Sequence, residues 1–183
     1  VVKKLVADNR DLRYGLFSFN PSDTRVGGAL LSDVVNFSRS INSSGVEVVS
    51  EAQAAANLKY FNTKVDSLTA STSTPLAEAY YEVTRYFRGM SRYQGAGSGA
   101  YTSPIQYRCQ KNFGIVVTDG LPTYDRTFPT DDPLRNNPAV SGPNDLPNWD
   151  GVVSNDGEKP TTGDEEGDTL YLDDIAGFAY DVD

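Results

Sequence analysis

The segment that most constrains the fold is an apolar run, residues 113–117 (FGIVV), which ends abruptly in Thr118, Asp119 and Gly120. This pattern predicts a buried strand over residues 113–119 that carries one carboxylate to the edge of a sheet, followed by a turn. In open α/β sheets, ligands bind at the carboxyl ends of the strands. Asp119 is therefore placed where a binding site would be expected.

The remaining periodic segments alternate between helix and strand. The clearest helix covers residues 74–88, where Thr74 suits the N-cap, Pro75 the first helical position and Gly89 the stop. Apolar spacing also predicts a strand over residues 12–19 with a short paired edge strand at 29–31, and helices over residues 1–8, 50–68 and 168–180. This order predicts an α/β layered domain with helices on both faces of a sheet.

Length and loop content favour one domain with large insertions. A chain of 183 residues fits a single domain over residues 1–183. Residues 90–108 are rich in Gly, Ser and Tyr, and residues 123–168 are acidic and almost without periodicity, so both are interpreted as inserted loops. Because two strong strands do not make a stable sheet, a further central strand is expected before Val1.

Charge and composition exclude several classes of function. A formal net charge of −9 argues against nucleic acid or an anionic membrane as partner, and favours cations or a basic protein face. The chain has no histidine, which excludes His-dependent triads and His-ligated zinc, so any metal must bind through oxygen ligands. No apolar run approaches the roughly 20 residues of a membrane helix, so no membrane insertion is expected.

Two segments together suggest a metal site. A threonine hydroxyl at a helix start and a carboxylate at a strand end can supply two oxygen ligands to a hard divalent cation. Each also has a common alternative role, Thr74 as a helix cap and Asp119 as the first residue of an Asp-Gly turn. The segments TPL (74–76) and VTDGLP (117–122) resemble, in that order, the second and third parts of the metal-ion-dependent adhesion site of von Willebrand factor A domains.

This resemblance implies a Rossmann-like von Willebrand A fold, incomplete at the N-terminus. It implies that Thr74 ligates Mg²⁺ or Ca²⁺ through its hydroxyl, and that Asp119 holds the metal directly or through water. The family's first segment, Asp-x-Ser-x-Ser, is expected before Val1, and Ser71 and Ser73 lie in the wrong loop to replace it. The site that these residues form within this chain is therefore expected to be partial.

Longer stretches are similar to the N-terminal region of the PilY family of type IV pilus proteins. The similar segments are residues 74–81, 101–113, 118–125, 167–176 and 179–183. The resemblance implies an exported protein at the cell surface, pilus tip or outer membrane of a Gram-negative bacterium. It also implies a role in pilus assembly and adhesion, with minor pilins, the pilus tip complex or a host or surface receptor as partners.

Two other functions compete with this binding module, which is expected not to be an enzyme. A metal-free scaffold for minor pilins needs no cation. A metal-dependent hydrolase could use Asp119 and Asp125 as paired carboxylates, although no nucleophile motif accompanies them.

Two further features have open interpretations. The acidic tract offers oxygens from Asp131, Asp132, Asp164 and Asp168, which either form a second cation site or are a solvated loop, without the spacing of an EF-hand. Cys109 is the single cysteine, so no disulfide can close within the chain. It is either a partner for a cysteine elsewhere, a redox-responsive thiol or a small buried apolar residue.

Overall fold

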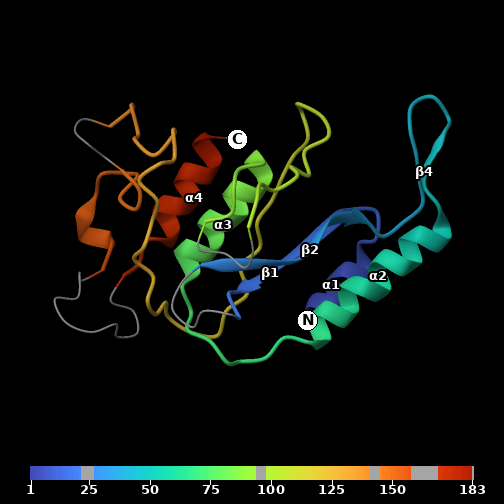
Figure 1. Cartoon of the computed structure of the whole chain (residues 1–183), viewed down its shortest axis with the longest axis horizontal. Coiled ribbons are helices and arrows are strands. Elements are labelled where there is room, and N and C mark those ends of the chain that lie inside the picture. The colour runs from blue at the N-terminus through green and yellow to red at the C-terminus, as the bar shows by residue number, and fades with distance from the viewer. Residues whose placement is uncertain (22–26, 94–97, 141–144, 158–168, 183) are drawn as a thin grey trace. The chain divides into compact units, whose positions relative to one another are not determined.

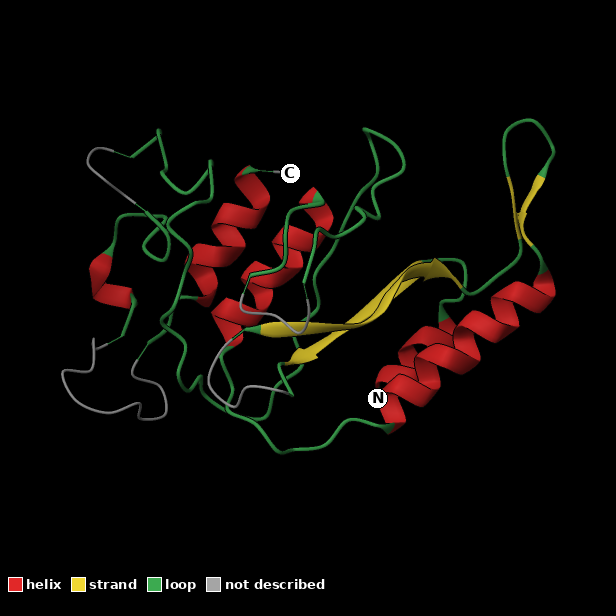
Figure 2. Cartoon of the chain, viewed as in Figure 1, coloured by secondary structure: helices red, strands yellow, loops and turns green. Residues whose placement is uncertain are grey.

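The computed structural model describes residues 1–21, 27–93, 98–140, 145–157 and 169–182. Within these ranges the chain is mixed α/β, with helices and two small sheets joined by long loops (Figures 1 and 2). The elements are α1 (Val2–Asp8), β1 (Arg13–Phe19), β2 (Gly28–Asn36), β3 (Ser40–Ile41), β4 (Glu47–Val49), α2 (Glu51–Asp66), α3 (Leu76–Arg88), the short 3-10 helix η1 (Val153–Asn155) and α4 (Leu172–Asp181).

The chain divides into two compact units. Unit 1 comprises Val1–Ser18 and Leu30–Ala70, and unit 2 comprises Phe19–Ala29 and Ser71–Asp183. Each unit has its own apolar core. Both segments that carry the predicted metal ligands belong to unit 2.

The core of unit 1 is built on three buried side chains. Val6 of α1, Phe61 of α2 and Phe37, which follows β2, form one buried apolar cluster. Phe37 stacks on Tyr14 of β1 with ring centroids 5.6 Å apart and meets the edge of Phe61 at 5.2 Å. These aromatic contacts hold the two helices and strands β1 and β2 around one core.

The two sheets of the structure each contain two strands. The predicted strand at residues 12–19 is confirmed as β1, and its predicted partner at 29–31 is the longer strand β2. The antiparallel pair β3 and β4 was not expected from the sequence. Its turn is set by Asn42, whose side-chain oxygen accepts the N–H groups of Ser44 and Val46 at 3.0 and 2.9 Å.

The core of unit 2 lies between α3 and α4 (Figure 1). Tyr81 of α3 packs on Ile175 and Phe178 of α4, and Trp149 meets the Phe178 ring edge-on at 4.9 Å. The predicted helix stop is confirmed, since Gly89 adopts a left-handed φ of 67° that most side chains would disfavour. Within the described ranges, no helix is both long and apolar enough to span a membrane.

The strand predicted over residues 113–119 is wrong. These residues form no strand, and the side chains of Phe113, Ile115 and Val117 are 79%, 69% and 66% exposed. A strand needs a neighbour that receives its backbone hydrogen bonds, and no described segment pairs with this run. The predicted sheet covered by helices on both faces is likewise not formed by the described residues, which give the coarser mixed α/β class.

Candidate functional site

The N-terminal end of α3 is the point where the two segments singled out in the sequence meet. The Thr74 N–H donates to the hydroxyl of Thr123 at 2.8 Å, and the Thr123 N–H donates back to the Thr74 carbonyl at 3.0 Å. The loop before α3 and the loop after Asp119 are thereby bonded side by side. The bonded residue, Thr123, directly follows the 117–122 segment that carries Asp119.

The helix cap is supplied by a residue that the sequence did not single out for this role. Helix α3 begins at Leu76, and neither Thr74 nor the N-cap residue Pro75 provides a capping side chain. Instead the buried carboxylate of Asp125 accepts the Ala77 N–H at 2.7 Å and the Glu78 N–H at 2.8 Å. The expected cap at Thr74 is wrong because Asp125 reaches these donors from a distant loop, where its charge also suits the positive end of the helix dipole.

Glu78 is a second buried carboxylate at the same helix end, and it accepts hydrogen bonds from two loops. One oxygen accepts the N–H groups of Arg126 at 3.0 Å and Thr127 at 2.6 Å, and the other accepts the Gly27 N–H at 2.9 Å. Glu78 therefore fastens two loops to α3 through their backbones. Such charge-assisted bonds are among the stronger hydrogen bonds in proteins.

Both carboxyl groups have raised pKa values. Burial raises the pKa of Glu78 to about 7, with backbone N–H bonds acting against it and the neighbouring Asp125 adding to it. Burial also raises the pKa of Asp125 to about 6, opposed by its two helix N–H bonds. These groups hold the loops that carry the candidate ligands, and they titrate near neutral pH.

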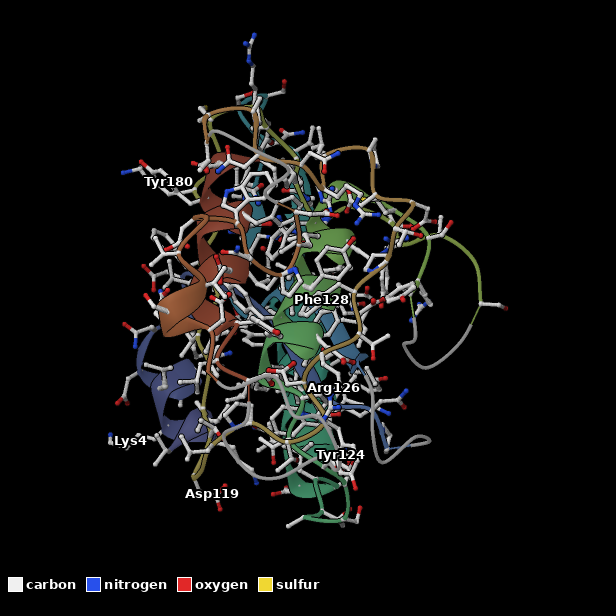
Figure 3. The ribbon with its side chains drawn as sticks, turned by 90° about the vertical axis from the view of Figure 1, so that its left-hand side faces the viewer. Lys4, Asp119, Tyr124, Arg126, Phe128 and Tyr180 are labelled. Atoms are coloured by element: carbon white, nitrogen blue, oxygen red, sulfur yellow. The ribbon has the colours of Figure 1, made fainter. Side chains whose placement is uncertain are left out.

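The loop that joins these contacts runs past α3 (Figure 3). Tyr124 has a left-handed φ of 56°, a conformation that side-chain-bearing residues rarely adopt. It lies between Thr123, which bonds Thr74, and Asp125, which caps α3. Further along, the ring of Phe128 meets the Tyr81 ring edge-on at 6.1 Å. The unusual backbone at Tyr124 accompanies a reversal that lets successive residues serve both contacts.

Of the two predicted metal ligands, Thr74 belongs to this framework, and Asp119 precedes Thr123 by four residues. Thr74 is half-buried, and Asp119 is exposed, with its side chain projecting away from the ribbon in Figure 3. Within the described part of the chain, neither the Thr74 hydroxyl nor the Asp119 carboxylate makes a hydrogen bond. Their oxygens suit Mg²⁺ or Ca²⁺ by type, although the described residues contain no group of three Asp, Glu, Cys or His side chains arranged to hold a metal.

The exposed apolar segment, residues 113–117, is held against α3 by a glycine. A Cβ built on Gly114 would lie 2.4 Å from Cε2 of Tyr80 and 2.5 Å from its hydroxyl oxygen, closer than atoms pack. The backbone therefore rests on the Tyr80 ring at this one position. On either side, Phe113, Ile115 and Val117 remain exposed.

The other sequence candidates have varied surroundings. Asp132 is buried and bonds the Arg88 guanidinium, the Tyr81 hydroxyl and the Leu134 N–H; although burial opposes it, these bonds lower its pKa to about 2. Asp132 is thus the buried partner of a half-buried arginine, whereas Asp131 is exposed. Asp164 and Asp168 lie outside the described residues.

Cys109 is a free, exposed cysteine. Its interpretation as a small buried apolar residue is therefore wrong. The other two interpretations stay open, because a thiol exposed to solvent can respond to oxidants or pair with a cysteine elsewhere.

A second network on α3 was not expected from the sequence. Glu82 is buried and accepts the Tyr101 hydroxyl at 2.6 Å and the Tyr93 N–H at 3.2 Å. Burial raises the pKa of Glu82, and its bonds to Tyr101 and Tyr93 lower it in part. Glu82 lies one turn after Glu78, so the two acids share one face of α3. Acids with this spacing usually face solvent, and the sequence therefore contained no signal that loops would cover them.

Comparison of the chain with protein-family models, with curated proteins and with solved structures found no match. The residues and their geometry are thus the basis for the functional conclusion.

Proposed function

We propose that this chain is a binding module of a PilY-type, cell-surface or pilus-tip protein that acts in type IV pilus assembly and adhesion. One observation carries the proposal: an exposed apolar segment, residues 113–117, leads directly into Asp119, four residues before Thr123, which bonds the Thr74 loop. Contiguous patches of exposed apolar side chains often mark sites where proteins interact. The ordered resemblance to von Willebrand A and PilY segments supplies the biological setting.

The proposed partner is a minor pilin, another component of the pilus tip or a surface receptor. The apolar side chains of Ile115 and Val117 would provide buried contact area on binding. Asp119 and the Thr74 hydroxyl would provide oxygen ligands to a divalent cation that bridges to an acidic group on the partner. Two such oxygens leave most of the coordination shell of Mg²⁺ or Ca²⁺ to other donors, as an adhesion site requires.

A metal-free scaffold is the second candidate. It is favoured by the same apolar segment, because hydrophobic contact with a pilin needs no cation. A hydrolase that pairs Asp119 with Asp125 is less well supported, because both oxygens of Asp125 already accept N–H groups from α3. The module is accordingly proposed to bind and not to catalyse.

Substitutions in the exposed segment test this proposal. Ile115→Lys and Val117→Lys should leave the stability of the chain within about 0.5 kcal/mol, because both side chains are already in solvent. They should weaken binding to immobilised minor pilins at least tenfold. Val46→Lys is the matched control, since Val46 is 58% exposed in the loop before β4 of unit 1.

Chelation separates the two binding modes. If a cation bridges the partners, EDTA and Asp119→Ala should each reduce pilin binding to the same extent. If the module is a metal-free scaffold, binding should survive both treatments and still be lost in Ile115→Lys. Unchanged pilin binding in Ile115→Lys and Val117→Lys would refute the binding surface itself.

A further inference from the structure

A buried carboxylate in unit 2 has one oxygen without a counterpart. Asp174, in the first turn of α4, is only 2% exposed. Its Oδ1 accepts the Asp150 N–H at 2.9 Å, whereas its Oδ2 has no hydrogen-bond partner among the described residues. An ionised oxygen buried without a partner is costly, so its native surroundings are expected to include a positive group or a donor.

Neighbouring acidic side chains make it still less favourable to ionise Asp174. The charges of Asp156, Asp150 and Asp173 all act to raise the pKa of Asp174, after the larger effect of burial. Asp156 is itself 2% exposed and lies at the end of η1. Two buried acids with two more beside them concentrate negative charge at one corner of the α3–α4 core.

The loop around these acids is held in place by its own bonds. The Leu170 N–H donates to the Asp156 carbonyl at 2.8 Å, and the Asn155 side chain donates to Asp173 at 2.9 Å. The Val152 N–H donates to Asp150 at 2.7 Å. The same loop contains Asn148, whose buried Oδ1 also has no hydrogen-bond partner within the described ranges. The loop therefore contains, besides its carboxylates, a buried neutral oxygen acceptor.

We propose that this corner binds one Ca²⁺ ion through the carboxylates of Asp174 and Asp156, with further oxygens from the loop of residues 148–157 and water. Ca²⁺ accepts irregular sets of six to eight oxygens, including carboxylate, amide and backbone carbonyl oxygens, whereas Mg²⁺ demands a near-octahedral shell. The described residues contain no group of three acidic side chains arranged to hold a metal. With two carboxylates as ligands, the shell would take its other oxygens from neutral groups and water, which Ca²⁺ accepts. This site is distinct from Thr74 and Asp119 and does not depend on the proposed function.

The full chain, stripped of metal with EDTA, provides the test. Trp149 is the only tryptophan, is buried beside Asp150 and packs on α4, so its fluorescence reports unfolding around the proposed site. Ca²⁺ at about 100 times its dissociation constant should raise the unfolding midpoint by roughly 5–10 °C. Equimolar Mg²⁺ should raise it much less, and calorimetry on Asp119→Asn, which lacks a ligand of the other candidate site, should still give one Ca²⁺ per chain.

Asn substitutions identify the ligands. Asp174→Asn keeps an acceptor for the Asp150 N–H but removes the charge, so it should abolish the Ca²⁺ response and leave the metal-free chain equally or more stable. Asp11→Asn, at an exposed aspartate of unit 1, is the control and should keep the response. If Asp174→Asn does not fold, Asp156→Asn, which should weaken Ca²⁺ binding at least tenfold, decides the matter.

Three results would overturn the site. They are the absence of any Ca²⁺ effect on the wild-type midpoint, a full response in folded Asp174→Asn and Asp156→Asn, and a response lost only in Asp119→Asn. The last would assign the ion to the Thr74 loop and support the metal-dependent form of the proposed function instead. Retention of the Asp174-dependent response with no pilin binding would leave this site standing while removing the proposed function.

Discussion

Removal of the carboxylate of Asp125 should destabilise unit 2 more than removal of any exposed acid. In Asp125→Ala, the N–H groups of Ala77 and Glu78 lose acceptors at 2.7 and 2.8 Å and remain buried. Each unsatisfied buried donor costs about 1–3 kcal/mol. The change also relieves the strain of an ionised buried carboxylate, which a pKa of about 6 indicates, and its repulsion of Glu78.

The net loss expected at pH 7 is about 2–4 kcal/mol, at or above the upper end for loss of an ordinary helix cap because two buried donors lose their acceptor. For a chain of this length, that corresponds to a fall of roughly 5–15 °C in the unfolding midpoint. Urea and thermal unfolding followed by Trp149 fluorescence measure it, because Trp149 belongs to the core between α3 and α4. Asp125→Asn retains one acceptor oxygen and should lose about half as much.

Asp119→Ala is the matched control for this experiment. Asp119 is an exposed aspartate six residues earlier, and its removal should change the stability by no more than about 0.5 kcal/mol. Equal unfolding midpoints for Asp125→Ala and wild type would refute the assignment of Asp125 as the cap of α3. Equal losses in Asp125→Ala and Asp119→Ala would show that net charge, and not the cap, determines the effect.

Three further outcomes are expected. Burial raises the folded-state pKa of Glu78 to about 7 and of Asp125 to about 6, so the folded chain binds more protons than the unfolded chain between about pH 4 and 7. The free energy of unfolding should therefore fall as pH rises through this window. In Glu78→Gln, urea unfolding measured across the same pH range should show a smaller fall. Gly114→Ala should cost about 1–3 kcal/mol by forcing the Tyr80 ring aside, and a double-mutant cycle with Tyr80→Ala should show strong coupling, whereas additive losses would exclude this contact. Cys109, being exposed, should react with a thiol reagent in the native chain at a rate close to that in urea; protection in the native chain would contradict its placement.

The sequence was informative where one element could be recognised from its own periodicity. Helices α2, α3 and α4 and strand β1 have the apolar spacing of their class, and Gly89 marks the end of α3 as predicted. The β3–β4 pair was missed because its residues are few and largely exposed, so the sequence shows no run of alternating apolar and polar residues there. Periodicity detects burial, and these strands bury little.

The candidate site shows the same limit at longer range. The order of two motifs directed attention to the Thr74 loop and to the segment that ends next to Thr123, which bonds it, but it did not identify the residue that caps α3. Asp125 acts from a position almost fifty residues beyond the donors that it accepts. Capping rules look only at neighbouring residues, so they selected Thr74. The absence of a strong N-cap side chain at Pro75 was the one local hint that the acceptor came from elsewhere.

The apolar run at residues 113–117 best shows what hydrophobicity does and does not determine. Its composition favours burial, yet Phe113 and Ile115 are exposed and only the glycine between them fits closely against Tyr80. Full burial of an apolar side chain is favourable by about 1.5–3 kcal/mol, but the amino-acid sequence does not show which surface will cover it. Exposure of several such side chains beside Asp119 therefore supplies an unused driving force for association. That force is the physical reason why this segment, mistaken for a core strand, is the strongest support for a binding function.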